Sequence, residues 1–183
     1  FLNLAYMKLK NLIDQDRKRY RNTFFKAFLV PSFRFLFWMR IASSFSIWHP
    51  IGFLSRVFFK FMQIRFGLQI PHIAKIGGGL FMGHYGGIVI SNEAVIGQNC
   101  NIAQGVTIGR INKGSKKGAP KIGDRVWIGP NVVLVGNITI GNNVLVAPLS
   151  FVNIDVPDNC MIIGNPAKIV EGKTSEDYIN FYK

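Results

Sequence analysis

Aliphatic residues recur at a spacing of six between residues 70 and 152, and this repeat restricts the possible folds more than any other feature of the sequence. A slip of two residues at 91–93 ends the first series, and the segment 110–120 ends the second. The three series are Ile70, Ile76, Met82 and Ile88; then Ile96, Ile102 and Ile108; and then Ile122, Ile128, Leu134, Ile140, Val146 and Val152. Glycine or alanine follows most members of the second and third series.

A period of six matches neither the helical turn nor the two-residue alternation of a hairpin sheet. The chain must therefore turn a corner at each repeat, and three turns close a triangular coil with the aliphatic side chains inside. Stacked coils pair their strands in parallel. The predicted fold class is mainly β: a left-handed parallel β-helix of hexapeptide repeats, preceded by an α-helical N-terminal region. A β-sandwich needs alternating polarity and regular turn signals, which this sequence lacks.

The first 66 residues differ in composition from the remainder. They carry twelve basic and two acidic residues, a net charge of +10, and 17 of the 24 aromatic residues. Helices are predicted over 2–20, 31–42 and 51–66 from their periodicity and from the prolines that open the last two. We therefore predict a basic, aromatic-rich helical region at 1–66, the β-helix at 67–170, and a C-terminal tail with a short helix at 171–183.

The third predicted helix carries an apolar stripe, made of Leu54, Val57, Phe58, Phe61 and Met62, while Arg56 and Lys60 lie on another side. One interpretation buries the stripe against a neighbouring helix or the prism. The other places it at a membrane surface, where aromatic residues flanked by cations suit anionic headgroups. The predicted location is accordingly cytoplasmic, with peripheral contact to the inner face of the membrane through residues 1–66 as the second interpretation.

The segment 110–120, RINKGSKKGAP, interrupts the repeat and carries four cations and no acid. An insertion of this kind is predicted to loop out of the prism. Loops on a rigid scaffold often carry function. Two interpretations stay open: a solvated basic loop, or a set of cations that meets phosphates or an anionic glycan.

Several classes of protein are excluded by what the sequence lacks. Cys100 and Cys160 lie 60 residues apart without a metal-binding spacing, which argues against a disulfide scaffold or a zinc finger and favours a reducing compartment. Only His72 and His84 fall in the predicted prism, so a three-histidine catalytic zinc site is not expected and no metal is predicted. The basic residues lie among bulky apolar ones and form no recognition motif, so nucleic acid is not a predicted partner.

Four segments carry a resemblance to a known family: KIGGGLFMGHYGGIVI at 75–90, QGVTIG at 104–109, the loop beginning at Arg110, and GNPAKIV at 164–170. Through them the chain from 68 to 170 resembles the serine acetyltransferases and their relatives that acetylate capsular and exopolysaccharides. FRFLFWMR at 33–40 looks like the helical lead-in of the polysaccharide branch, to which we interpret the chain as closest.

The resemblance implies transfer of an acetyl group from acetyl-CoA to a hydroxyl, in a homotrimer with its active site between neighbouring prisms. His84 matches the catalytic histidine of the family. Chemistry supports this role, because an alcohol needs a base that takes its proton as it attacks a thioester, and imidazole is such a base near neutral pH. The family match places an oxyanion-binding backbone N–H near Gly109.

By the same match, the coenzyme is bound by Gly129, Ala147 and Lys168. The two small residues would leave room for the pantetheine arm, and the lysine would pair with phosphate. Small residues are also required at the corners of a β-helix, so a purely structural role for Gly129 and Ala147 stays open.

The positions at which this chain departs from the family pattern are those that orient the histidine or bind the serine acceptor. Gln69 stands where serine-acetylating members have an aspartate that orients the histidine, although its amide oxygen still accepts a hydrogen bond. Gly83 replaces an aspartate that holds the serine ammonium, and residues 118–119 replace an arginine–histidine pair that grips the carboxylate. Without these charges, buried serine would leave its own charges unpaired.

We therefore predict an acetyl-CoA-dependent O-acetyltransferase that acts on a carbohydrate hydroxyl in surface polysaccharide biosynthesis, with the acceptor free, nucleotide-linked or lipid-linked. Its general base is His84, positioned by Gln69. The alternative is a serine O-acetyltransferase of cysteine biosynthesis. A second alternative is a nonenzymatic trimer that serves assembly or binds a membrane surface.

Overall fold

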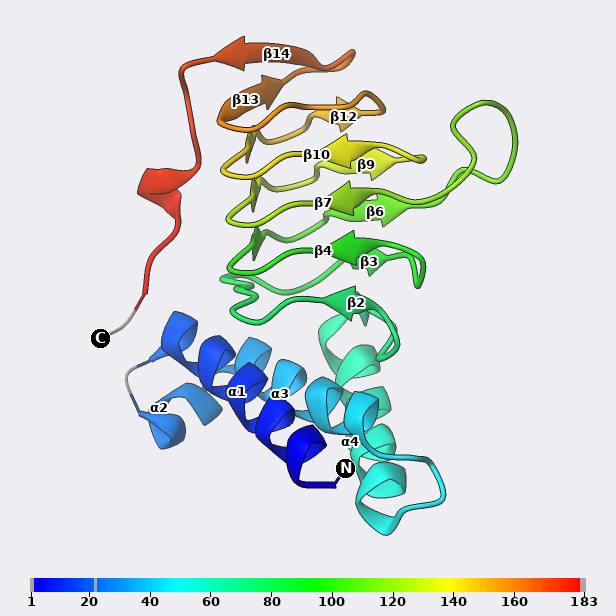
Figure 1. Ribbon diagram of the computed structural model, residues 1–183, viewed down its shortest axis with the longest axis vertical. Helices are drawn as coiled ribbons and strands as arrows, with labels where there is room; N and C mark the ends of the chain where they lie inside the picture. The colour runs from blue at the N-terminus through cyan, green and yellow to red at the C-terminus, as the bar shows by residue number, and fades with distance from the viewer. Residues whose placement is uncertain (1, 22, 182–183) are drawn as a thin grey trace.

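The computed structural model describes residues 2–21 and 23–181, and in these residues three β-sheets form a triangular prism with four α-helices across one end (Figure 1). Sheet A contains β1 (Leu68–Gln69), β3 (Ile88–Ile90), β6 (Thr107–Gly109), β9 (Val133–Val135) and β12 (Phe151–Val152). Sheet B contains β2 (Lys75–Ile76), β4 (Val95–Ile96), β7 (Lys121–Ile122) and β10 (Thr139–Ile140). Sheet C contains β5 (Asn101–Ile102), β8 (Trp127–Ile128), β11 (Leu145–Val146), β13 (Cys160–Ile163) and β14 (Lys168–Glu171).

The predicted fold class, a left-handed parallel β-helix behind a helical N-terminal region, is confirmed. Strands one coil apart pair in parallel, and the repeated aliphatic residues lie in register above one another, as in the column Ile76, Ile96, Ile122 and Ile140 of sheet B. These side chains are at most 8% exposed. Each such burial contributes about 1.5–3 kcal/mol, so the column accounts for the shape of the prism. Only β14, antiparallel to β13, breaks the pattern among the described strand pairs.

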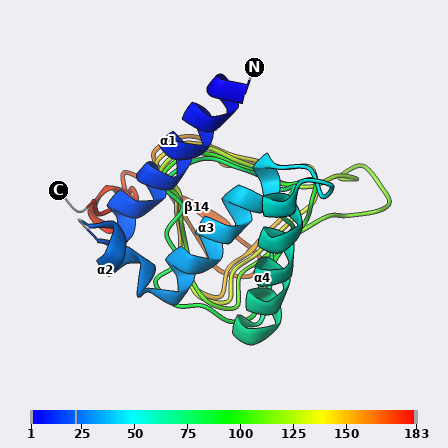
Figure 2. The same ribbon diagram turned by 90° about the horizontal axis from the view of Figure 1, so that it is seen from below.

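Helices α1 (Leu2–Tyr20), α2 (Phe24–Phe28), α3 (Pro31–Ser44) and α4 (Pro50–Phe66) cover the prism end below β2 (Figure 2). The predicted helices over 2–20, 31–42 and 51–66 are present. The sequence does not predict helix α2, because a segment of five residues is too short to show a helical period. Helix α4 ends at Gly67, whose left-handed φ of 63° turns the chain into β1.

Helix α4 turns most of its predicted apolar stripe outward. The side that faces the rest of the chain presents Gly52, Ser55 and Phe59, which are buried. Four stripe residues are 41–62% exposed, namely Leu54, Val57, Phe58 and Phe61. The interpretation that a neighbouring helix or the prism buries the stripe is therefore wrong for Leu54, Val57 and Phe61, because α3 packs mainly against the side of α4 that carries Phe59. Phe58 stacks on Trp38 of α3 and is only partly covered by it.

A buried ion pair fastens the helices to the prism. The Nε atom of Arg40 on α3 lies 2.9 Å from Oδ2 of Asp16 on α1, and the two side chains are 6% and 1% exposed. Asp16 accepts hydrogen bonds from the backbone N–H groups of Gly79 and Leu80, at 2.8 and 3.1 Å. Arg40 donates to two backbone carbonyls of the same coil. Both charges are thus fully hydrogen-bonded, as burial requires.

The C-terminal tail returns along sheet C toward the helices (Figure 1). After β14 it forms the single turn η1 (Glu176–Tyr178). The ring of Tyr178 lies against Trp127, with centroids 4.9 Å apart, and Asn101 donates to the Tyr178 carbonyl at 2.8 Å. Arg19 of α1 donates to the carbonyl of Asn180. The tail therefore connects the side of the prism to the helical end.

Loss of the buried ion pair is expected to destabilise the fold strongly. Asp16→Ala leaves Arg40 charged and buried without its partner, so the free energy of unfolding should fall by about 3–5 kcal/mol. Asp14→Ala is the matched control, since Asp14 pairs with Arg17 and Lys18 at the surface and its loss should cost less than about 1 kcal/mol. Urea unfolding followed by circular dichroism measures both, and equal losses would show that the buried pair does not hold the two parts together.

Candidate active site

His84 lies at the prism corner where the chain passes from sheet C to sheet A. It is exposed, and it sits between Phe81, which bridges to the strand β5, and β3. The turn after it is formed by Gly86 and Gly87, whose φ values of 117° and 66° favour glycine. The N–H of Gly87 donates to the carbonyl of Gly67 at 2.9 Å. The backbone thus fixes the corner while leaving the imidazole accessible.

A cavity of about 430 Å³ opens beside His84. Its lining comes from three successive coils: Phe81, Gly83, His84, Asn101, Ile102, Ala103, Gln104, Trp127 and Pro130. The rings of Phe81 and Trp127 give it aromatic walls, and the amides of Asn101 and Gln104 give it polar ones. A volume of this size suits a small molecule or the reactive end of a larger one.

Gln104 is a residue of this cavity that the sequence reasoning missed. Its Oε1 atom is buried and has no hydrogen-bond partner within the described residues. A buried acceptor without a partner costs about 1–3 kcal/mol. The atom is therefore free to accept a hydrogen bond from an N–H or O–H group of a molecule in the cavity. One feature of the sequence could have pointed to Gln104: it opens the segment QGVTIG and directly follows Ala103, the small residue of a repeat.

The C-terminal tail supports two walls of the cavity. Asn101 donates a hydrogen bond to the Tyr178 carbonyl and accepts one from Arg19, while Trp127 packs against the Tyr178 ring at an interplanar angle of 45°. These contacts leave the cavity faces of both side chains with little freedom. No sequence signal points to them, because the partners lie 51–82 residues apart along the chain.

A column of small residues rises from the cavity along sheet C. Ala103, Gly129 and Ala147 follow the strands β5, β8 and β11, and their N–H groups each bond to the coil above, at 2.9–3.0 Å. A methyl group on Gly129 would lie 2.8 Å from the backbone nitrogen of Pro148, so glycine is required there. At the top, the exposed Lys168 pairs with Ile163 of β13. The structure thus brings Gly129, Ala147 and Lys168 into one line with the His84 cavity.

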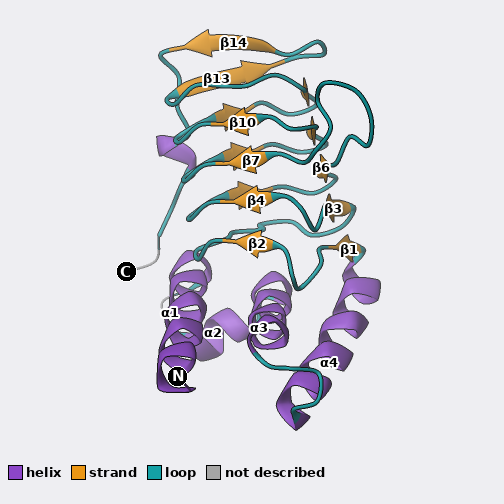
Figure 3. Cartoon of the chain, turned by 45° about the vertical axis from the view of Figure 1, so that its right-hand side comes forward, coloured by secondary structure: helices purple, strands orange, loops and turns teal. Residues whose placement is uncertain are grey.

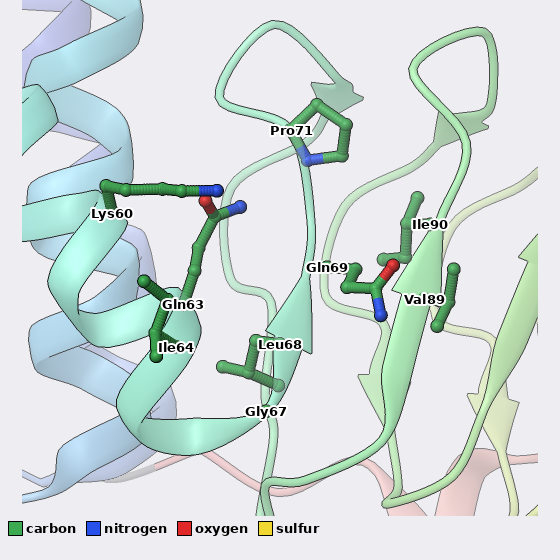
Figure 4. Close-up of a pocket in the computed structure, with 9 residues that line it drawn as sticks. All are labelled: Lys60, Gln63, Ile64, Gly67, Leu68, Gln69, Pro71, Val89 and Ile90. Carbon is green, nitrogen blue, oxygen red and sulfur yellow. The ribbon is translucent and has the colours of Figure 1, made fainter.

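Gln69 lines a different cavity. This second hollow, of about 540 Å³, lies between α4 and sheet A, and Figure 4 shows Gln69 across it from Lys60 and Gln63. Among the described residues no hydrogen bond joins Gln69 to His84. The role of Gln69 in orienting the histidine stays a prediction.

Gly109 lies across sheet A from the corner that carries His84. It ends β6, whereas His84 precedes the adjacent parallel strand β3, so the two stand at opposite edges of the same sheet. One chain does not bring them together, and the oxyanion role of Gly109 stays a prediction that needs a second protomer.

The loop 110–120 follows Gly109 and projects from the prism (Figure 3). An antiparallel bridge between Ile111 and Gly118 closes its base. Arg110 pairs with Glu93, and Lys116 donates to the carbonyl of Asn153. Lys113 and Lys117 are exposed at its outer part. The loop therefore presents cations beside the edge of sheet A that carries Gly109.

Cys100, which precedes Asn101 of the cavity, is not a candidate nucleophile. It is fully buried, and burial raises the pKa of its thiol to about 12. The reactive form of a cysteine is the thiolate, which is therefore scarce here at neutral pH. No group of three or more His, Cys, Asp or Glu residues in 2–21 and 23–181 is arranged to hold a metal ion. His84 is thus the side chain of the cavity best suited to proton transfer.

Comparisons with known proteins agree on one class of relative. The family model described as bacterial transferase hexapeptide (six repeats) matches residues 119–153. Serine acetyltransferase 2 of Arabidopsis thaliana is 40% identical over 112 residues, which is 61% of this chain and 35% of that protein. The chain spans about a third to a half of the curated relatives that it matches most strongly.

Solved structures of the same class match most of the chain. The serine acetyltransferase of Neisseria gonorrhoeae in complex with serine is 31% identical, with a TM-score of 0.74 over 91% of this chain and 71% of that one. A serine acetyltransferase in complex with CoA is 26% identical, with a TM-score of 0.73 over 92% of this chain and 73% of that one.

The buried acceptor in the cavity can be tested by stability. Gln104→Leu replaces an unpaired amide by an apolar side chain of similar size, so the free energy of unfolding should rise by about 1 kcal/mol. Gln98→Leu is the matched control, since Gln98 is an exposed glutamine, and should change it by less than about 0.5 kcal/mol. Urea unfolding of the two variants and of wild type measures these changes in the free energy of unfolding. A loss on Gln104→Leu would mean that the amide serves the fold and is not held for a ligand.

Proposed function

The chain belongs to the hexapeptide transferase family and is homologous to serine acetyltransferases, and from this premise we propose that it is an acetyl-CoA-dependent serine O-acetyltransferase. The observation that carries the proposal is the line of His84, its cavity and the column of small residues that ends at Lys168. This line offers a base at one end and a cation at the other, with the small residues Ala103, Gly129 and Ala147 between them and Ile163 beside Lys168.

In the proposed reaction His84 acts as the general base. It takes the proton of the serine hydroxyl as the oxygen attacks the thioester carbonyl, the C–S bond then breaks, and the proton passes on to the leaving thiolate. Trp127 and Asn101 border the place of attack, and Gln104 accepts a hydrogen bond from one of the substrates. The backbone N–H near Gly109 of a neighbouring protomer donates to the developing oxyanion.

The column on sheet C is the proposed binding edge for acetyl-CoA. Gly129 and Ala147 carry no side chain large enough to obstruct a pantetheine arm that runs along the corner. Lys168 at the top offers an ammonium group to phosphate. The related serine acetyltransferase that was solved in complex with CoA supports this choice of donor.

The opposed positions of His84 and Gly109 support a homotrimer. His84 precedes β3 and Gly109 ends β6, so the two residues lie at opposite edges of sheet A. Because β3 and β6 are adjacent strands, both residues stand at nearly the same height on the prism. Prisms that meet edge to edge in a closed ring bring one protomer's Gly109 to its neighbour's His84. The same contact places the cations of the loop 110–120 at the neighbour's cavity. The proposed active site is therefore shared between protomers.

The prediction of a carbohydrate acceptor in surface polysaccharide biosynthesis, and of closest resemblance to that branch, is wrong. The curated relatives and solved structures are serine acetyltransferases, one of them in complex with serine. The prediction rested on charges missing at Gly83 and at residues 118–119. That reasoning assumed that only those positions can supply a charge, whereas the exposed Lys113 and Lys117 of the loop provide cations close to the shared site.

The proposed function is tested by thiol release from acetyl-CoA with L-serine as acceptor. Wild type should acetylate serine, and His84→Ala should lower kcat/KM by about 10²–10⁴ because it removes the general base. His49→Asn is the matched control, since His49 lies at the start of α4 and asparagine keeps its capping acceptor. Folded wild type that leaves serine unmodified would contradict the acceptor, and a fully active His84→Ala protein would contradict the role of the histidine.

A second kinetic test addresses the donor edge. Lys168→Ala removes the cation at the top of the column, so KM for acetyl-CoA should rise about five- to tenfold while kcat changes less than about twofold. Lys121→Ala, an equally exposed lysine on sheet B, should leave both constants near wild type. A fall in kcat with unchanged KM would place Lys168 outside the coenzyme site.

A further inference from the structure

The helical end of the molecule exposes a large apolar surface. Twelve exposed apolar side chains lie on α2, on α4 and in the segments that follow α2 and α3, and we call them the apolar helix face: Phe24, Phe25, Leu29, Ile47, Trp48, Ile51, Phe53, Leu54, Val57, Phe58, Phe61 and Ile64. Trp48 is 93% exposed and Phe25 is 84% exposed. Exposed apolar surface on this scale marks an interaction site.

Aromatic contacts make the face continuous across three helices. Phe24 and Phe28 of α2 contact Phe37 of α3, at centroid distances of 5.8 and 5.4 Å. The next residue on α3, Trp38, contacts Phe37 at 5.4 Å and stacks on Phe58 of α4 at 4.8 Å. The helices lie side by side across the prism end (Figure 2). The exposed residues of α2 and α4 are therefore parts of one surface.

The charges around this face have a single sign. No Asp or Glu occurs between residues 17 and 92. Lys26, Lys60 and Arg65 are exposed on α2 and α4. The two earlier acids, Asp14 and Asp16, are engaged in ion pairs. Helices with exposed apolar residues, exposed cations and no acid match a surface that is apolar inside and anionic outside.

We propose that the apolar helix face binds the surface of an anionic lipid bilayer. Its aromatic and aliphatic side chains enter the boundary between headgroups and acyl chains, and Lys26, Lys60 and Arg65 meet the lipid phosphates. Trp48, in the turn before α4, has the amphipathic ring that favours this boundary. None of the helices in the described part of the chain is both long and apolar enough to span a bilayer, so the contact is peripheral.

A second copy of the chain fits this face less well. Two copies that met through the same face about a twofold axis would set cations opposite cations, without an acid between residues 17 and 92 to separate them. Like charges in contact destabilise an interface. Lipid phosphates instead supply a negative partner for each of the cations.

The proposed trimer would strengthen the contact. Because His84 and Gly109 lie at the same height, the threefold axis that joins them runs parallel to the prism, and the three helical ends then point in the same direction. Three faces on one bilayer bind with avidity. This gain rests on the proposed function, whereas the binding of one face does not.

Vesicle sedimentation of the full chain tests the proposal without substrates, so its result is independent of the acetylation assay. Wild type should sediment with vesicles of phosphatidylcholine and phosphatidylglycerol at 7:3 and much less with phosphatidylcholine alone, and 0.5 M NaCl should reduce the binding. The combined change Phe25→Ser, Trp48→Ser and Leu54→Ser should lower the partition coefficient at least tenfold. Its matched control, Ile73→Ser, Leu149→Ser and Ile163→Ser, removes exposed apolar residues from the prism and should bind as wild type does.

The cations are tested separately. Lys26→Gln with Arg65→Gln should lower the partition coefficient at least tenfold, since each basic residue contributes about fivefold at an anionic surface. Lys113→Gln with Lys117→Gln makes the same charge change on the prism loop and should have a small effect.

A spectroscopic readout does not depend on the folding of variants. Tryptophan fluorescence of wild type should be quenched by vesicles with brominated acyl chains, and Trp48→Phe should remove most of that quenching. Absence of vesicle binding, or binding unaffected by the face variants, would overturn the proposal. So would sedimentation velocity that shows the face variants splitting a larger assembly of wild type in the absence of lipid, because the face would then join copies of the chain.

Discussion

The stacked aliphatic columns inside the prism determine where every functional group lies. Because Ile76, Ile96, Ile122 and Ile140 lie in register, each coil repeats the path of the one below it. Corners therefore recur at the same place on each coil, and Ala103, Gly129 and Ala147 come to stand in a line although 44 residues separate the first from the last. Packing of the aliphatic side chains, which take no part in the proposed reaction, thus aligns the edge along which a long substrate can lie.

The second constraint is the buried pair of Asp16 and Arg40. It bonds to the backbone of the first coil, so it fixes the helices at one end of the prism and prevents them from covering its sides. The apolar side chains of α2 and α4 then face away from the core. Exposure of so much apolar surface costs free energy in water. The proposed contact with a bilayer would remove these side chains from water.

Local sequence signals predict the parts of the structure that depend on local geometry. The period of six predicts the prism, and the glycines around His84 together with the small corner residues indicate the proposed catalytic corner and the proposed donor edge. Long-range contacts leave no such signal. Nothing near Trp127 in the sequence points to Tyr178, and the buried amide of Gln104 becomes evident only when its surroundings are known. Gln69 lines a different cavity from His84 within the one chain, a separation that the spacing of the two residues in the sequence does not reveal. The proposed approach of Gly109 to His84 depends on how a second chain packs, which a single sequence does not encode locally.

The two ends of the proposed site differ in their distance from the proposed membrane. The His84 cavity lies on the first coils, next to the helices, whereas Lys168 lies on β14 at the far end of the prism (Figure 1). Coenzyme A carries phosphates, which an anionic bilayer repels within about a Debye length, roughly 8–10 Å at physiological salt. A prism that stands on its helical end would hold these phosphates well beyond that range. Membrane binding and donor binding would therefore not compete, because the column separates them along its length.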